Sequence, residues 1–222
     1  VQQIAGGMAG DKLFQDLCDG SEKWNNETHV KADEEVKKMA DVGYFQDGYI
    51  GMGPEESTDL FTNGKSAMYF MGAWDADKIQ KSGIGEDAGA FVLPAYDAQF
   101  NNISVGSVDT SFAVSETCKN KDAAVAFLKF WTSQEMEEML LYENSRIPAD
   151  NFELDTSKLT PLMGEVLTSS NEQVGLTPWW DRQFGAGEGV EFNNTCVSVL
   201  GGEDAKGAFD ALQQFAEDNA DR

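Results

Sequence analysis

Apolar residues recur at helical spacing along much of the chain. Residues 31–41 place Val36 and Met39 among charged side chains, which predicts a surface helix. Ser133 is a residue type favoured at helix N-caps, and it indicates where the second helix of a pair begins. The same spacing predicts helices over residues 11–18, 31–41, 55–63, 74–81, 124–131, 134–142, 160–169, 191–200 and 204–219.

Short runs of β-favouring residues lie between these helices. Residues 66–70, SAMYF, predict a buried strand, and residues 88–94, AGAFVLP, predict a second strand that a proline ends. Residues 101–115 predict a strand, a kink at Gly106 and another strand, with a passage between lobes. Residues 177–189, with paired Trp and several Gly, predict a loop. This alternation favours an α/β layered architecture with a mainly helical C-terminal half.

The composition adds a strong charge bias. The 222 residues carry 16 Lys and Arg against 39 Asp and Glu, a net charge of −23, and their number fits one large domain or two small ones. Such a field repels phosphate backbones and anionic lipid headgroups, which argues against nucleic acid and direct membrane-surface partners. Cys18, Cys118 and Cys196 lie far apart. We expect three buried thiols, with one disulfide bridge left open as the alternative.

Few residues suit catalysis. His29 is the one histidine, and its polar surroundings favour a surface position over the role of base or metal ligand. The sequence has no G-x-S-x-G motif, no phosphate-binding glycine loop and no calcium-binding loop. It therefore predicts no catalytic residue, no metal site and no cofactor.

Tryptophans beside carboxylates are the remaining candidates. Trp74 precedes Asp75, and the pair Trp179 and Trp180 precedes Asp181. An indole packs well on the apolar face of a sugar ring, and a carboxylate accepts hydrogen bonds from the hydroxyl rim. We predict that at least one of these three tryptophans is exposed in a cleft.

Other interpretations of these residues stay open. Each of the three tryptophans could be a core residue, as we predict for Trp24 and Trp131 from their helical or helix-adjacent positions. Asp75 and Asp181 could be the paired carboxylates of a glycoside-acting enzyme. A binder of peptides, polyamines or metals is a further alternative, which the aromatic, cation-poor loops favour less than a sugar binder.

A motif that ends at Trp74 resembles a known family. The pattern F-x-x-G-K-x-A-M followed by G-x-W is similar to that of extracellular solute-binding proteins of family 1, the sugar-binding components of bacterial ABC importers, which include maltose-binding protein. Its residues here are Phe61, Gly64, Lys65, Ala67, Met68, Gly72 and Trp74. VLP at 92–94, the helix pair from Asn120, RIPA at 146–149 and the helix within 200–218 resemble later family elements in family order. The resemblance covers residues 11–219.

The resemblance implies an α/β fold, the periplasmic-binding-protein-like (type II) second lobe with a helix-rich C-terminal half. The first lobe is then largely missing, as in a truncated fragment. Residues 1–104 would be a second-lobe α/β segment. Residues 105–150 would be the hinge crossing and a helix pair belonging to the first lobe, and residues 151–222 would be C-terminal helices that pack on the second lobe.

The resemblance also implies a function: capture of a carbohydrate for an ABC importer, without enzymatic activity or cofactor. The implied partners are the sugar and the permease subunits, not nucleic acid, and the implied state is a monomer. The full-length form would be extracellular, as a membrane-anchored lipoprotein, or periplasmic. Trp74 matches the sugar-stacking tryptophan of the family's second lobe. The predicted ligand contacts are Trp74, Asp75, Asp109, Arg146, Trp179, Trp180 and Asp181.

Overall fold

The structure, a computed structural model, describes residues 1–107 and 111–219, without the side chains of residues 185 and 186. The chain divides into two compact units. Unit 1 comprises residues 1–52, 92–107 and 172–222, and unit 2 comprises residues 53–91 and 108–171. The three segments that the resemblance assigns to lobes have other boundaries, and their assignment stays a prediction.

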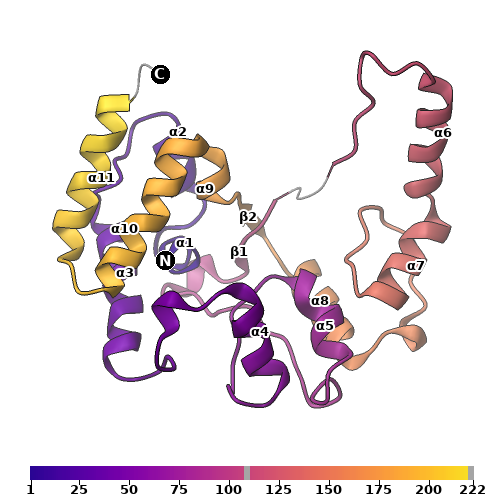
Figure 1. Cartoon of the computed structure of the whole chain (residues 1–222), viewed down its shortest axis with the longest axis horizontal. Helices are drawn as coiled ribbons and strands as arrows, with labels where there is room; N and C mark the ends of the chain where they lie inside the picture. The colour runs from indigo at the N-terminus through magenta and orange to yellow at the C-terminus, as the bar shows by residue number, and fades with distance from the viewer. Residues whose placement is uncertain (108–110, 220–222) are drawn as a thin grey trace. The chain divides into compact units, whose positions relative to one another are not determined.

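Unit 1 consists mainly of helices together with a pair of short strands (Figure 1). Its helices are α1 Gln2–Ala9, α2 Lys12–Cys18, α3 Glu27–Asp41, α9 Trp180–Gln183, α10 Val190–Leu200 and α11 Ala205–Asn219, with a π-helical turn at Gly185–Gly189 and 3-10 turns at Tyr49–Gly51 and Ala98–Phe100. The helices predicted over residues 11–18, 31–41, 191–200 and 204–219 are confirmed, and α3 begins one turn earlier than predicted.

The strands β1 Ile103–Val105 and β2 Gly175–Thr177 pair in parallel. A side chain of α1 takes the place of a further strand beside β1. The Gln3 amide nitrogen donates to the Ile103 carbonyl at 2.9 Å, and the Gln3 oxygen accepts from the Val105 N–H at 2.8 Å. These bonds satisfy backbone groups that an edge strand leaves unpaired, and they fix α1 against the sheet.

The core of unit 1 lies where α3, α10 and α11 pack together (Figure 1). Asn26 caps α3, because its side-chain oxygen accepts from the His29 N–H at 3.0 Å. The core is rich in aromatic rings, and its buried hydrophobic residues are Ile4, Ala5, Leu13, Phe14, Leu17, Trp24, Ala32, Trp180, Phe192, Phe209 and Leu212. The prediction that Trp24 is a core residue is confirmed.

Unit 2 contains helices and irregular segments, and no strand, in its described residues. Its helices are α4 Pro54–Thr62, α5 Ala76–Gln80, α6 Lys121–Trp131, α7 Gln134–Asn144 and α8 Pro161–Asn171, with 3-10 turns at Ala73–Asp75 and Thr156–Lys158. α5 lies beside α8 (Figure 1). The main hydrophobic cluster of this unit comes from α5, α7 and α8, and its buried residues are Ala76, Leu141, Leu162, Met163 and Leu167.

The predicted stop of α4 at Gly64 is confirmed in detail. Gly64 has a left-handed backbone with φ of 66°, which glycine adopts without strain. Its N–H donates to the Phe61 carbonyl at 2.9 Å, and the Lys65 N–H donates to the Leu60 carbonyl at 2.8 Å. This pair of bonds is the Schellman motif, which satisfies the last carbonyl groups of a helix.

Two predicted strands are not strands. Residues 66–70 and 88–94 have irregular backbone, and Met68, Phe70 and Phe91 are at least 70 % exposed, so the prediction of buried strands is wrong. A strand needs a neighbour that takes up its backbone hydrogen bonds. Within the described ranges only β1 and β2 pair in this way. The strand predicted after Gly106 is absent from residues 111–115, and residues 108–110 lie outside the described part.

The side chains of α6 are largely open to solvent. None of its residues is buried, and Phe127 and Phe130 are each about half exposed, at 51 % and 52 %. Trp131 is half-buried against the rings of Phe112 and Phe127, with centroid distances of 5.7 and 5.9 Å. The prediction that Trp131 is a core residue is therefore wrong. In the part of the chain that the structure describes, no helix has both the length and the apolar character needed to cross a membrane.

Candidate functional site

Trp74 lies in the 3-10 turn that leads into α5, and its side chain is 45 % exposed. Its six-membered ring lies against the backbone of Gly72. A Cβ atom at that glycine would stand 2.2 to 2.5 Å from three carbons of the ring. Gly72 has extended backbone angles that any residue adopts. Glycine is needed here because the Trp74 ring occupies the space that a side chain would fill, and not because of the backbone angle φ. The G-x-W pattern therefore lets the indole fold back on the chain and still present surface to solvent.

The Asp75 carboxylate ties this turn to α4. Its Oδ2 accepts a hydrogen bond from the Tyr69 hydroxyl at 2.8 Å and lies 3.1 Å from the Thr58 hydroxyl. The two hydroxyl groups are 2.8 Å apart, and Thr58 is buried. Burial, with a further contribution from Asp75, raises the pKa of Tyr69 to about 12, so this hydroxyl keeps its proton and stays a donor. Phe61 stacks on the Tyr69 ring at a centroid distance of 5.7 Å.

Trp180 belongs to the core of unit 1. Its side chain is 1 % exposed, and its ring packs edge-on against His29 at 4.9 Å and Phe192 at 5.4 Å. A ligand could reach it only if that core opened, so the prediction that Trp180 contacts the ligand is wrong. The residues predicted as a loop here form α9 and a π-helical turn, which turn this indole inward.

Trp179 and Asp181 flank Trp180 and are more accessible. The Arg182 guanidinium lies over the Trp179 ring, 4.9 Å from its centroid, as in a cation–π contact. The Asp181 carboxylate is exposed, and the Asn193 side-chain amide donates to it at 3.5 Å. Their role as ligand contacts stays a prediction.

Arg146 is exposed and follows α7, where Ser145 adopts a left-handed backbone with φ of 53°. It lies in unit 2, as do Trp74 and Asp75. Its role as a ligand contact also stays a prediction. Asp109, the remaining predicted contact, lies outside the described residues.

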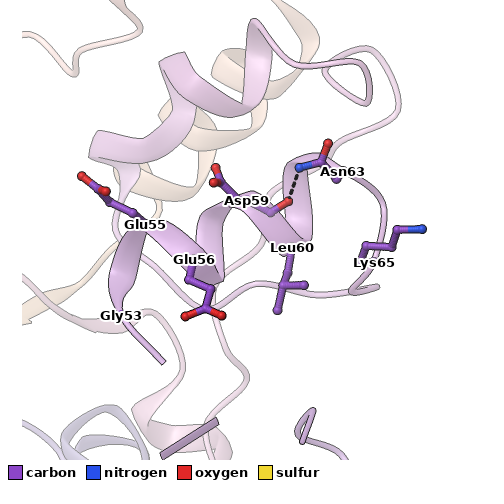
Figure 2. Close-up of a pocket in the computed structure, with 7 residues that line it drawn as sticks. All are labelled: Gly53, Glu55, Glu56, Asp59, Leu60, Asn63 and Lys65. Atoms are coloured by element: carbon purple, nitrogen blue, oxygen red, sulfur yellow. Dashed lines mark hydrogen bonds between the residues drawn. The ribbon is translucent and has the colours of Figure 1, made fainter. Parts of the chain in front are cut away.

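A surface depression of unit 2 lies along α4 (Figure 2). It is lined by Gly53, Glu55, Glu56, Asp59, Leu60, Asn63 and Lys65. The Asn63 amide donates to the Asp59 carbonyl at 2.7 Å, and the Asp59 carboxylate pairs with Lys78 at 3.1 Å. In Figure 2 the Glu56 and Leu60 side chains project from the same side of the helix. Charged groups dominate this lining and no aromatic ring contributes to it, so it offers no surface for stacking.

Sequence reasoning missed a buried polar cluster in unit 1, formed by His29, Asp33 and Cys196. His29 is fully buried, its Nδ1 lies 2.8 Å from the Trp24 carbonyl, and burial lowers its pKa to about 4. The prediction that His29 lies at the surface is wrong. Burial raises the pKa of Asp33 to about 6, and burial, followed by the charge of Asp33, raises the pKa of Cys196 to about 12. His29 and Asp33 are enclosed in the core, and Cys196 is partly buried, so neither the imidazole nor the carboxylate is accessible to a ligand.

The burial of the cysteines also differs from the prediction. All three cysteines are free thiols, but Cys18 is exposed and Cys118 and Cys196 are partly buried. The expectation of three buried thiols is therefore wrong: Cys18 ends the short helix α2 on its solvent side, and the other two thiols are only partly covered.

Comparison with known sequences agrees with the motif around Trp74. The family described as bacterial extracellular solute-binding protein matches residues 2–138. The galactooligosaccharide-binding protein of Bacillus subtilis (strain 168) is 30 % identical over 126 residues, which are 56 % of this chain and 29 % of that protein. These matches confirm the resemblance that the sequence indicated.

Solved structures share the fold. A chitin oligosaccharide binding protein superposes with a TM-score of 0.87 and 21 % identity, over 97 % of this chain and 55 % of its own. A structure from work on xylan utilization by the thermophilic bacterium Caldanaerobius polysaccharolyticus superposes with a TM-score of 0.85 and 23 % identity, over 96 % of this chain and 56 % of its own. A Streptococcus pneumoniae solute-binding protein in complex with the blood group A-trisaccharide superposes with a TM-score of 0.70 and 17 % identity, over 97 % of this chain and 55 % of its own. The chain spans about half the length of these structures, and the periplasmic-binding-protein-like fold class is confirmed.

Proposed function

The chain belongs to the bacterial extracellular solute-binding proteins, and from this premise we propose that it takes part in capturing an oligosaccharide for an ABC importer. The observation that carries the proposal is the accessible indole of Trp74, seated on Gly72 within the family motif. A sugar ring placed on such an indole removes apolar C–H groups and ring carbons from water. The partners of the whole protein would be the sugar and the permease subunits, and no cofactor would take part.

The names of its relatives support an oligosaccharide as the ligand class. The curated relative is named for galactooligosaccharide and one structural relative for chitin oligosaccharide. A sugar-binding site also combines a stacking ring with polar groups that bind the hydroxyl groups of the sugar, and an oligosaccharide offers several such hydroxyl groups. Family membership implies an extracellular or periplasmic location. We propose that a lipid anchor holds the full-length form at the membrane.

Binding without catalysis is the form of this function that the residues support. The one histidine is enclosed in the core of unit 1, where no substrate meets it. One oxygen of Asp75 already accepts a hydrogen bond from Tyr69. A glycoside-acting enzyme needs two carboxyl groups that face one bond of the substrate, and the proposal assigns Asp75 and Asp181 no such role.

Titration of this chain with galacto-, chito- and xylo-oligosaccharides, followed by calorimetry, tests the proposal. We expect saturable binding of at least one of them, and we expect Trp74→Ala to weaken it by about 5- to 30-fold, since one stacked ring is worth roughly 1 to 2 kcal/mol. The matched control is Phe127→Ala, which removes another half-exposed ring of unit 2 outside the family motif. Equal effects of the two substitutions, or release of reducing ends during the titration, would overturn the proposal.

A further inference from the structure

We propose that Asp75 is a positioning residue: through Tyr69 and Thr58 it anchors the turn that carries Trp74, so that the indole is held ready for a sugar ring. The inference rests on the proposed function and deepens it by assigning a task to the carboxylate beside the stacking tryptophan. It also names two hydroxyl-bearing residues that the sequence did not single out.

The anchor begins in a helix. Thr58 lies within α4, is 3 % exposed, and its hydroxyl lies 2.8 Å from the Pro54 carbonyl of the preceding turn. A threonine held in this way has one well-defined side-chain position. The Asp75 Oδ2 lies 3.1 Å from that hydroxyl, which places the carboxylate on the buried side of α4. The backbone of Asp75, and with it the 3-10 turn that holds Trp74, is thereby fixed relative to the helix.

Tyr69 provides the second point of attachment. Its neighbours Met68 and Phe70 are 75 % and 74 % exposed, so the segment that leads to Gly72 has little packing of its own. The Tyr69 ring stacks on Phe61 of α4, and its hydroxyl donates to Asp75 at 2.8 Å. This one side chain therefore holds an otherwise poorly packed segment against both the helix and the turn.

The segment against which the Trp74 indole packs lies between the two anchored residues, Tyr69 and Asp75. Gly72 lies between Tyr69 and Asp75 in sequence, and its lack of a side chain makes room for the Trp74 ring. If the bond between Tyr69 and Asp75 were lost, both ends of the Gly72 segment could move, and the ring would lose its fixed seat. A side chain ordered before binding loses less conformational entropy when the ligand arrives. Asp75 thus contributes to affinity without touching the sugar.

The test compares Asp75→Ala, Asp75→Asn and Tyr69→Phe by acrylamide quenching of the Trp74 fluorescence. That signal is isolated by subtracting the fluorescence of each variant made in a Trp74→Phe background. We expect Asp75→Ala to raise the quenching of Trp74 by up to about twofold, because 45 % of the side chain is exposed already. Asp75→Asn keeps an acceptor oxygen and should restore part of the protection. Tyr69→Phe keeps the stack on Phe61 and should give an intermediate increase.

Asp77→Ala is the matched control. It removes a carboxylate of α5 that pairs with Lys81 at the surface, and it should leave the Trp74 signal unchanged. In the oligosaccharide titration we expect Asp75→Ala to weaken binding by about two- to tenfold, from the lost ordering of one side chain.

The outcomes separate this inference from the proposed function. If Asp75→Ala weakens sugar binding and leaves Trp74 quenching unchanged, Asp75 contacts the sugar directly and the positioning role is wrong. If the unaltered chain binds no oligosaccharide, the proposed function fails for this chain. In that case the quenching of Trp74 alone decides the inference, which holds if Asp75→Ala raises it and fails if it does not.

Discussion

Replacing Asp33 with Asn should stabilise unit 1 at neutral pH. Asp33 lies on α3 and is fully buried. Neither of its carboxylate oxygens has a well-formed hydrogen bond with a described group. The Cys196 thiol lies nearby, but a thiol is only a weak donor. Burial raises the pKa of Asp33 from 3.8 to about 6. Asp33 therefore holds its proton more tightly in the folded chain than in the unfolded chain, and its ionised form, which prevails at neutral pH, destabilises the folded state.

The size of the effect follows from this pKa shift. A group whose pKa is raised on folding adds stability below its unfolded pKa, here 3.8, and that stability is lost as the pH rises through about 6. A rise of about 2 units at about 1.4 kcal/mol per unit corresponds to roughly 3 kcal/mol. Because Asn is neutral at every pH, Asp33→Asn should be more stable than the unaltered chain by about 2 to 3 kcal/mol near pH 7.5, with little difference near pH 4.

Urea unfolding at these two pH values measures the difference. Tryptophan fluorescence measured in a Trp74→Phe, Trp131→Phe background reports on unit 1, because the remaining tryptophans lie in that unit and Trp24 and Trp180 lie in its core. The control is Glu34→Gln, which changes the net charge equally at an exposed neighbouring position on α3. If Asp33→Asn is no more stable than Glu34→Gln near pH 7.5, the argument from burial of an ionised carboxylate is refuted.

Two further substitutions test the packing around the indoles. Gly72→Ala places a Cβ 2.2 Å from the Trp74 ring, so the ring must move; oligosaccharide titration should show an affinity loss close to that of Trp74→Ala, while the free energy of unfolding changes little. An unchanged affinity would show that the ring need not rest on Gly72. Trp180→Ala should destabilise unit 1 by about 3 to 5 kcal/mol in urea unfolding, because it leaves a large cavity in the core. A loss below about 1 kcal/mol would contradict its place in the core.

Much of the helical structure could be predicted because its determinants are local. The apolar spacing of α11 and the stop of α4 at Gly64 depend on residues within one or two turns. The strand predicted before Gly106 is confirmed as β1, but its partner could not be predicted in this way, since β1 pairs with β2 about 70 residues further along the chain. Residues 66–70 have strand-like composition but no partner strand among the described residues.

The errors at single residues have equally specific causes. The polar neighbours of His29 favour a surface position, and a helix predicted to begin at residue 31 leaves this histidine outside it. With Asn26 as the cap, His29, Ala32 and Asp33 occupy one buried face of α3 at spacings of three and four. Trp180 stands beside Trp179 in sequence, and only the formation of α9 separates a buried ring from a half-exposed one.

In the candidate site, too, local sequence patterns could be predicted and contacts between distant residues could not. The family motif singles out Trp74 as a candidate ligand contact, and the structure adds why a glycine, Gly72, stands two residues before it. The contact of Asp75 with Thr58 and Tyr69 joins α4 to a turn outside that helix, and no residue spacing in the sequence encodes such a contact.

The ratio of oligosaccharide affinities between the unaltered chain and Trp74→Ala tests the central claim most directly. The account predicts a ratio of about 5 to 30 for the best-bound of the galacto-, chito- and xylo-oligosaccharides, with Phe127→Ala close to 1. A saturable sugar whose affinity is the same in Trp74→Ala as in the unaltered chain would contradict it.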